Sequence, residues 1–299
     1  MNYKDREELY NGEILHHVDY PKTDHWLPGD NKELYDKHCK DDFQRHILEL
    51  NGFYPYTPIT YNINRQGFRD NRDLSLEKPG NFIAIGCSIT AGDGLFQEQT
   101  YAYKLEQQLE QPVYNLGLPG RGHEAMFRVL SYYVPKLRPK AVFLQTTSTT
   151  RRELFSSDNG KIVVYEPVGH WSVDDNPDND KQAIDTKLRM LADQDVYFAS
   201  KRTFYAIDAL CKHNNAELYV LDGWNLILQK RLDTEGMATD LARDLRHAGP
   251  LYHTRLAEQF LKAYNNKTPI NDIYDESLYI QDNLPTGHIR KRMPKSIRK

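Results

Sequence analysis

The sequence predicts an α/β protein in which helices cover both faces of a mostly parallel β-sheet. Three observations lead to this prediction. Short apolar runs of strand length alternate with helical segments from residue 81 onward. The runs are continuously apolar, as expected for strands that are buried on both faces. The chain of 299 residues is also long enough to bury a sizeable core.

The expected elements follow one another in a regular order. The first strand is NFIAIG, which starts at Asn81 and ends in a glycine and a polar turn. A helix over 100–110, a strand PVYNLG, a helix EAMFRVLSYYVPKL and a strand KAVFLQTT come next. A helical segment over 185–213 precedes the fourth strand, AELYVLD. The last helix is PLYHTRLAEQFLKAY, and we expect four of its apolar residues roughly on one face: Leu251, Leu256, Phe260 and Leu261.

Composition divides the chain into an N-terminal extension, a central domain and a C-terminal extension. Residues 1–80 are polar and aromatic, and we expect them to pack on the core. The α/β domain spans 81–266, with an inserted hairpin and acidic loop at about 156–184. Residues 267–299 form the C-terminal extension, and six of the last ten are Lys or Arg. A run of this kind is most often a solvated tail.

The N-terminal extension offers few regular elements. Residues 32–50 suit one amphipathic helix whose apolar face is only partly filled, and residues 59–68 suit a hairpin or an extended segment that wraps around the domain. Flat aromatic rings are a common wall of sugar-binding clefts, but we expect the rings here to cover an apolar face of the α/β domain. The rings concerned are Tyr54, Tyr56, Tyr61 and Phe68.

Composition and motifs exclude several classes of function. A net charge of −3 gives no strong attraction to nucleic acid or anionic membranes. The mean hydropathy is −0.74, and no apolar run approaches the ~20 residues of a membrane span. No secretory signal is visible, and three cysteines at unrelated spacings favour a reducing, cytoplasmic setting. The glycines of nucleotide-binding loops and the spacings of metal ligands are missing, so we expect no cofactor and no metal.

The loop after the first strand carries the first candidate for chemistry. In open α/β sheets, ligands bind beyond the carboxyl ends of the strands. The sequence GCSIT places Ser88 there, at the start of a helix, where backbone N–H groups can receive a developing negative charge. The alternative is that Ser88 only caps the helix. The loop is not a G-x-S-x-G elbow, because Thr90 replaces the final glycine.

A serine nucleophile needs a base, and the base needs an orienting carboxylate. Of the 11 histidines, only His247 has an aspartate three residues before it, Asp244. At that spacing one short turn can direct both side chains into the same cleft. The carboxylate would then contact Nδ1 and leave Nε2 for the serine. The alternative is that Asp244 and His247 are an ordinary pair of residues on the protein surface, with no catalytic role.

These motifs together resemble the SGNH (GDSL-like) hydrolase family. GCSIT, NLGLPG after the second strand and DLRHAGPLYHTRLAEQF at the last helix carry the resemblance, over about residues 81–264. It implies a three-layer, flavodoxin-like α/β/α fold. It also implies that Ser88 is the nucleophile, His247 the general base and later general acid, and Asp244 its orienter. The oxyanion would be bound by the backbone N–H groups of Ser88 and Gly120.

The chain departs from the family pattern in two places. Cys87 replaces the aspartate of the G-D-S loop, and we expect its side chain to point into the domain. In the third block, QTTSTTRRE stands where the family has G-x-N-D, whose Asn is an oxyanion donor. By alignment Thr149 takes the place of that Asn, with Ser148 one position away. Arg151 is a candidate to hold an anionic substrate group, with a bond to loop carbonyls or to Glu153 as the more ordinary interpretation.

The residues therefore predict a serine ester hydrolase acting on small acyl esters, such as the O-acetyl groups of carbohydrates. The alternatives are a catalytically weak relative that binds a glycan or a protein, and a flavodoxin-like small-molecule binder. The intact set of Ser88, Asp244 and His247 favours the enzyme. We expect a small-molecule or glycan ester as partner, and no membrane or nucleic acid. The stretch TPITYNINRQGFRD resembles SGNH-like proteins of marine bacteria and phages, which leaves a phage-encoded origin open, together with the oligomeric state.

Overall fold

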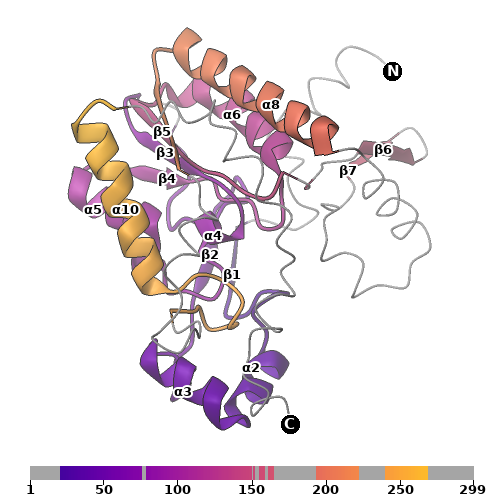
Figure 1. The fold of residues 1–299 in the computed structure, drawn as a ribbon, viewed down its shortest axis with the longest axis vertical. Helices are drawn as coiled ribbons and strands as arrows, with labels where there is room; N and C mark the ends of the chain where they lie inside the picture. Colours follow the sequence, from indigo (N-terminus) through magenta and orange to yellow (C-terminus); the bar gives the residue numbers. More distant parts are fainter. Residues whose placement is uncertain are drawn as a thin grey trace.

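A four-stranded parallel sheet forms the centre of the protein in the computed structural model (Figure 1). Counted along the chain, its strand order is 2-1-3-4, which is the flavodoxin-like order. The prediction of an α/β fold with a parallel sheet is therefore confirmed. The strands in spatial order are β4 (Val113–Asn115), β3 (Phe82–Ile85), β5 (Ala141–Gln145) and β8 (Glu217–Leu221). The structure describes residues 21–75, 79–149, 151, 155–158, 161–164, 193–221 and 240–268.

Helices cover both faces of this sheet, which makes three layers (Figure 1). Along β3, Ile83 and Ile85 pack under one pair of helices, whereas Phe82 and Ala84 pack under the other pair. Burial on both faces explains why the strands read as continuous apolar runs. The first pair is α6 (His123–Leu137) and α8 (Asp193–His213), and the second pair is α5 (Tyr101–Leu109) and α10 (Pro250–Asn265).

The apolar face of α10 is narrower than the sequence indicated. Leu256 and Phe260 are fully buried and Leu261 is partly buried, but Leu251 is 49% exposed. The inclusion of Leu251 in this face was wrong. It lies five residues before Leu256, and five residues at 3.6 per turn rotate a side chain about 140° away.

The helix expected over 32–50 is divided into α2 (Lys32–Cys39) and α3 (Asp42–Leu50). The division occurs at Asp41, whose extended backbone starts α3 and whose side chain accepts the N–H of Gln44 at 2.9 Å. A cap of this kind starts a new helix instead of continuing the old one. In Figure 1 the two helices lie beyond the end of the sheet where α4 is placed.

The expected hairpin over 59–68 is only partly present. A short strand, β2 (Tyr61–Ile63), does form, but it pairs antiparallel with β1 (Lys22–Asp24), which the sequence analysis missed. After β2 the chain reverses at once, since the N–H of Asn64 donates to the carbonyl oxygen of Phe68 at 2.9 Å. The chain thus makes a tight turn after β2, and the strand that pairs with β2 is β1, which is far away in the sequence.

The aromatic residues of the extension divide into two groups. Tyr61 and Phe68 are fully buried, which confirms that they belong to the core. Tyr54 and Tyr56 are exposed, and the ring of Tyr56 stacks on that of Trp26 with centroids 5.6 Å apart. The expectation that all four rings cover the core therefore fails for Tyr54 and Tyr56.

The insertion begins with the expected hairpin, formed by β6 (Phe155–Asp158) and β7 (Lys161–Val164). The acidic loop of the insertion, residues 185–192 and the basic tail lie outside the described residues. The proposed domain boundaries stay predictions. Among the described helices, none is both long and apolar enough to cross a membrane.

Candidate active site

Ser88 lies where β3 ends and the short helix α4 (Ser88–Ala91) begins, beyond the carboxyl end of a central strand (Figure 1). The turn into the helix is tight. A Cβ on Gly86 would lie 2.0 Å from the Thr90 hydroxyl oxygen, and Gly92 ends the helix at φ 79°. The Ser88 side chain is thereby held near the surface, with 7% of the residue exposed.

A buried polar cluster supports the loop that carries Ser88. The Thr90 hydroxyl donates to Oε1 of Gln145 at 3.1 Å, and the Tyr101 hydroxyl lies 3.0 Å from Thr90. The Cys87 thiol donates to the same Gln145 oxygen at 3.7 Å and is 1% exposed. The prediction that Cys87 points into the domain is thus confirmed. The sequence analysis missed Gln145, because one glutamine at a strand end carries no pattern.

The structure brings Ser88, His247 and Asp244 into one chain of hydrogen bonds. Nδ1–H of His247 donates to Oδ2 of Asp244, which leaves Nε2 of the neutral imidazole as an acceptor. The Ser88 hydroxyl lies 2.8 Å from this Nε2, and it can donate to Nε2 when the imidazole is neutral. Oδ1 of Asp244 accepts the N–H groups of Arg246 and His247, both at 3.0 Å. The carboxylate is therefore fixed by the backbone on one side and fixes the imidazole on the other.

The loop before α10 folds back on itself to present this pair. The N–H of Ala242 donates to the carbonyl oxygen of His247 at 3.1 Å, and Leu245 between them has φ 53°. Asp240 accepts the N–H groups of Leu251 and Tyr252 at 3.0 and 2.6 Å. These contacts tie the loop to the first turn of α10.

The charges in the site favour a protonated His247. Burial lowers the pKa of His247, but the charge and hydrogen bond of Asp244, with the nearby charge of Asp93, raise it to about 9. Burial opposes ionisation of Asp244 as well, yet the charge of His247 and the hydrogen bonds hold the pKa of Asp244 below its usual value. The resting site therefore carries an ion pair, and His247 becomes a base only as the pH rises.

Asp93 is a second carboxylate at the site that the sequence analysis did not identify. It follows the end of α4 and is 7% exposed, and its Oδ1 accepts no hydrogen bond from any described residue. Burial raises the pKa of Asp93 to about 6, against the opposing charges of His247 and Arg69. A lone aspartate between two glycines looks like an ordinary turn residue in the sequence, so nothing marked it.

The N–H groups expected to bind an oxyanion lie on two adjacent loops. Ser88 is the first residue of α4, so its N–H has no acceptor within that helix. Gly120 has φ 74°, a conformation that favours glycine, and it lies in the loop between β4 and α6. This loop packs tightly on α4, since a Cβ on Gly117 would lie 2.2 Å from the backbone nitrogen of Ala91.

The loop after β5 carries the residues expected to supply the third donor. Thr149 is buried and Ser148 is partly exposed. The N–H of Thr147 donates to Nε2 of His123 at 3.0 Å, which holds this loop against the start of α6. The assignment of Thr149 or Ser148 as oxyanion donor stays a prediction.

Arg151 follows in the same loop and is partly exposed. Its carbonyl oxygen lies against Gly122, where a Cβ would be only 2.5 Å away. Its expected partner in the ordinary interpretation, Glu153, lies outside the described residues. The substrate role suggested for Arg151 therefore stays a prediction.

Several solved structures match this chain. TesA matches 63% of the chain and 98% of its own length, at 12% identity and a TM-score of 0.37. The psychrotrophic esterase EstA from Pseudoalteromonas sp. matches 62% and 98%, at 13% identity and a TM-score of 0.37. A candidate lipolytic protein of the G-D-S-L family from Desulfitobacterium hafniense matches 61% and 98%, at 12% identity and a TM-score of 0.38. The chain is similar to GDSL-type lipolytic proteins.

No protein-family model matches the sequence, and no curated protein matches it. The TM-scores to the GDSL-type structures lie below 0.5, and the identities are near one residue in eight. The chemistry of the site is therefore argued from the contacts within this chain.

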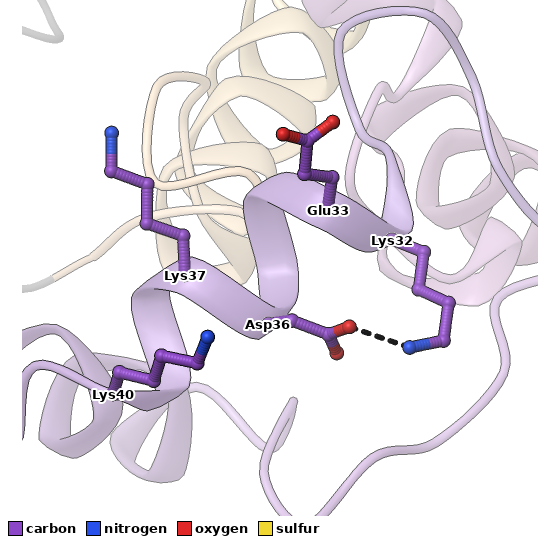
Figure 2. Close-up of a pocket in the computed structure, with 5 residues that line it drawn as sticks. All are labelled: Lys32, Glu33, Asp36, Lys37 and Lys40. Atoms are coloured by element: carbon purple, nitrogen blue, oxygen red, sulfur yellow. Dashed lines mark hydrogen bonds and ion pairs between the residues drawn. The ribbon is translucent and has the colours of Figure 1, made fainter.

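A surface hollow of about 630 Å³ lies on α2 and is separate from the three hydrogen-bonded residues (Figure 2). Lys32, Glu33, Asp36, Lys37 and Lys40 line it, and Lys32 pairs with Asp36 at 2.5 Å. These side chains are exposed and the charges of both signs are mixed, which is typical of a solvated helix face. Within the described part of the chain, no group of three or more His, Cys, Asp or Glu residues is arranged to hold a metal ion.

Proposed function

We propose that this protein is a serine ester hydrolase that works through an acyl-serine intermediate. The observation that carries the proposal is the position of His247 between the Ser88 hydroxyl, 2.8 Å from Nε2, and the carboxylate of Asp244. A hydroxyl, a base and an orienting carboxylate in this order are the requirements of acyl transfer by serine.

The reaction follows from the roles of these groups. Nε2 of neutral His247 takes the Ser88 proton while Oγ attacks the ester carbonyl carbon, and a tetrahedral oxyanion forms. The N–H groups of Ser88 and Gly120 are the proposed donors to this oxyanion, with a hydroxyl of Thr149 or Ser148 as the third. The imidazolium then gives its proton to the leaving alcohol. Water, activated by the same imidazole, cleaves the acyl-serine and releases the acid.

The accessibility of the site favours a small acyl group. Only 7% of Ser88 and 23% of the His247 side chain are exposed, so little of the reacting groups is accessible to a substrate. Acetyl esters, including O-acetyl groups on carbohydrate, are the substrates we propose. Arg151 is the candidate contact for an anionic group on the alcohol.

The test is hydrolysis of p-nitrophenyl acetate at pH 9 by the wild type and by Ser88→Ala. Ser131→Ala is the matched control, because the Ser131 hydroxyl only donates to the carbonyl oxygen of Arg128 within α6. We expect Ser88→Ala to lose at least about 10³ of the rate and Ser131→Ala to keep it. A fluorophosphonate should label the wild type at Ser88, and octanoate esters should react more slowly than acetate.

Equal rates for the wild type and Ser88→Ala, with no labelling, would overturn the proposal. The alternative is then a glycan-binding protein, for which the exposed ring of Tyr56, stacked on Trp26, is the candidate contact. Loss of glycan-array binding in Tyr56→Ala would support that alternative.

A further inference from the structure

Asp30, in the N-terminal extension, is a buried carboxylate that contacts the His247 loop of the proposed enzyme through Arg243 and is linked to the Ser88 loop through Tyr61. It is 1% exposed. Its backbone is held in a narrow turn, where Leu27 and Asp30 exchange N–H···O hydrogen bonds of 3.0 and 3.1 Å. Its two carboxylate oxygens have partners on Arg243 and Tyr61, which are both fully buried. A buried and fully bonded carboxylate of this kind is rigid.

The first connection runs from Asp30 to the loop that carries Asp244 and His247. Arg243 directly precedes Asp244, and its Nε and Nη2 donate to the Asp30 carboxylate at 3.0 and 2.6 Å. Nη2 also donates to the carbonyl oxygen of His25 at 2.9 Å. The guanidinium lies 4.0 Å from the ring centroid of Trp26. The Arg243 guanidinium is thus held by three groups of the extension: the Asp30 carboxylate, the His25 carbonyl oxygen and the Trp26 ring.

The second connection runs from Asp30 to the loop that carries Ser88. The Tyr61 hydroxyl donates to Oδ2 of Asp30 and accepts the N–H of Gly94 at 3.0 Å. Burial and the charge of Asp30 raise the pKa of Tyr61, so this hydroxyl keeps its proton. The ring of Tyr61 also lies 4.3 Å from the guanidinium of Arg69.

Arg69 extends this second connection to α4. Its Nη2 donates to the carbonyl oxygen of Leu95 at 2.6 Å, and its Nη1 donates to the carbonyl oxygens of Ala91 and Gly92. The carbonyl groups of Ala91 and Gly92 lie at the end of the helix that begins at Ser88, and that of Leu95 lies in the turn after it. The extension therefore holds the end of α4 and the following turn from one side.

We propose that Asp30 is a positioning residue, which sets the distance between Ser88 and His247 by joining Arg243 to Tyr61. This inference rests on the proposed function, because it assigns the distance a catalytic purpose. The contact that it controls is the 2.8 Å hydrogen bond between the Ser88 hydroxyl and Nε2 of His247. Misplacement of reacting groups by about 1 Å is enough to lower a rate by about 10².

The test is Tyr61→Phe, with Tyr35→Phe as the matched control. Tyr35 is also buried in the extension, and its hydroxyl donates at 2.9 Å to the carbonyl oxygen of Phe53, outside the catalytic loops. Both variants lose one buried hydroxyl. We expect Tyr61→Phe to lower kcat about tenfold or more, with KM changed by less than about twofold and with equally slower fluorophosphonate labelling. Tyr35→Phe should keep kcat. Equal kcat values for both variants would overturn the inference.

Asp30→Asn tests the carboxylate itself. Because Asp30 reaches the Ser88 loop through Tyr61, the double variant should lose less kcat than the product of the two single losses. Fully multiplicative losses would contradict the shared route. If Asp30→Asn does not fold, the comparison of Tyr61→Phe with Tyr35→Phe decides alone.

The failure of the proposed function would be recognised separately. Equal rates of p-nitrophenyl acetate hydrolysis by the wild type and Ser88→Ala would refute the hydrolase function, independently of the role of Asp30. The positioning role can then be tested without catalysis, because the midpoint of the His247 titration, measured by NMR, depends on the groups around His247. Ser88 and Asp244 contact His247 directly, and the charges of Asp93 and Cys87 also act on it. Tyr61→Phe should shift the His247 midpoint and Tyr35→Phe should not. No shift in either variant would overturn the positioning role.

Discussion

Gly94, six residues after Ser88, and Arg243, four residues before His247, meet backbone to backbone. The N–H of Arg243 donates to the carbonyl oxygen of Gly94 at 2.9 Å. A Cβ on Gly94 would lie 2.9 Å from the Cβ of Ala242 and 3.1 Å from the nitrogen of Arg243. This contact joins the loop after Ser88 to the loop before His247, and it leaves no room for a side chain.

We therefore expect Gly94→Ala to lower both stability and activity. The added methyl group must push the two loops apart, which costs about 1–3 kcal/mol of unfolding free energy and lengthens the contact between Ser88 and His247. Gly52→Ala is the matched control, since Gly52 has nearly the same φ, 78° against 76°, and nothing within 4 Å of its added Cβ. Thermal melts and kcat measured on both variants separate the clash from the backbone strain. The idea fails if the two alanines have the same effect.

The rate of ester hydrolysis should rise with pH to an alkaline plateau. His247 acts as a base only when neutral, and its pKa is raised to about 9, so kcat/KM should increase through that pH. Asp93→Asn removes a negative charge that stabilises the imidazolium, so the midpoint should move to lower pH. A pH–rate profile checks both statements. Asp42→Asn, which alters a carboxylate 91% exposed on α3, should leave the midpoint in place. A midpoint unmoved by Asp93→Asn would contradict this account.

The free energy of unfolding should fall between about pH 6.5 and pH 9. A histidine whose pKa is raised by folding stabilises the protein fully below its unfolded pKa of 6.5, and this stabilisation is lost as the pH rises through about 9. The loss is about 3 kcal/mol as an order of magnitude. Denaturant titrations at several pH values measure it.

His247→Gln is the control for this stability prediction, because it removes the titrating group. The other two charges act at different pH. The pKa of Asp93 is raised to about 6, so its contribution to the free energy of unfolding is lost as the pH rises through about 6, below the range in which His247 acts. The pKa of Asp244 is lowered, so its contribution is lost only when the pH becomes strongly acid. The same slope above pH 6.5 in His247→Gln and in the wild type would show that another group is responsible.

Cys87→Ala should keep most of the activity, within about threefold. The thiol is 1% exposed and bonded to Gln145, so it supports the loop and does not face the substrate. Assays with p-nitrophenyl acetate and with iodoacetamide test this, with Cys39→Ala as a control for a more accessible thiol. Inactivation of the wild type by iodoacetamide, prevented in Cys87→Ala, would instead identify Cys87 as the nucleophile.

The α/β layers were predictable because the signals for them are local. A strand buried on both faces, such as β3, reads as an apolar run, and the Asp-x-x-His spacing of Asp244 and His247 lies within one turn. The three-residue strand β1 has no such signal. Its pairing with β2 joins residues almost 40 positions apart, so only the folded structure reveals it.

The support of the site was not predictable for a related reason. Asp30 and Arg243 contact each other across 213 residues, and neither lies in a motif. Asp93 and Gln145 are single polar residues whose burial depends on the whole domain. Periodicity and spacing identify which side chains share an element, but they do not identify which elements will enclose a charge.

The long sequence separation of Asp30 and Arg243 also has a consequence during synthesis. At roughly 5–20 residues per second, the ribosome adds the 213 residues between the two in roughly 10–40 s. Throughout that interval the carboxylate of the nascent chain lacks the guanidinium that it will bind. The N-terminal extension, although made before the α/β domain, can complete its docking only after Arg243 has been made, so the two proposed catalytic loops are joined late in the synthesis of the domain.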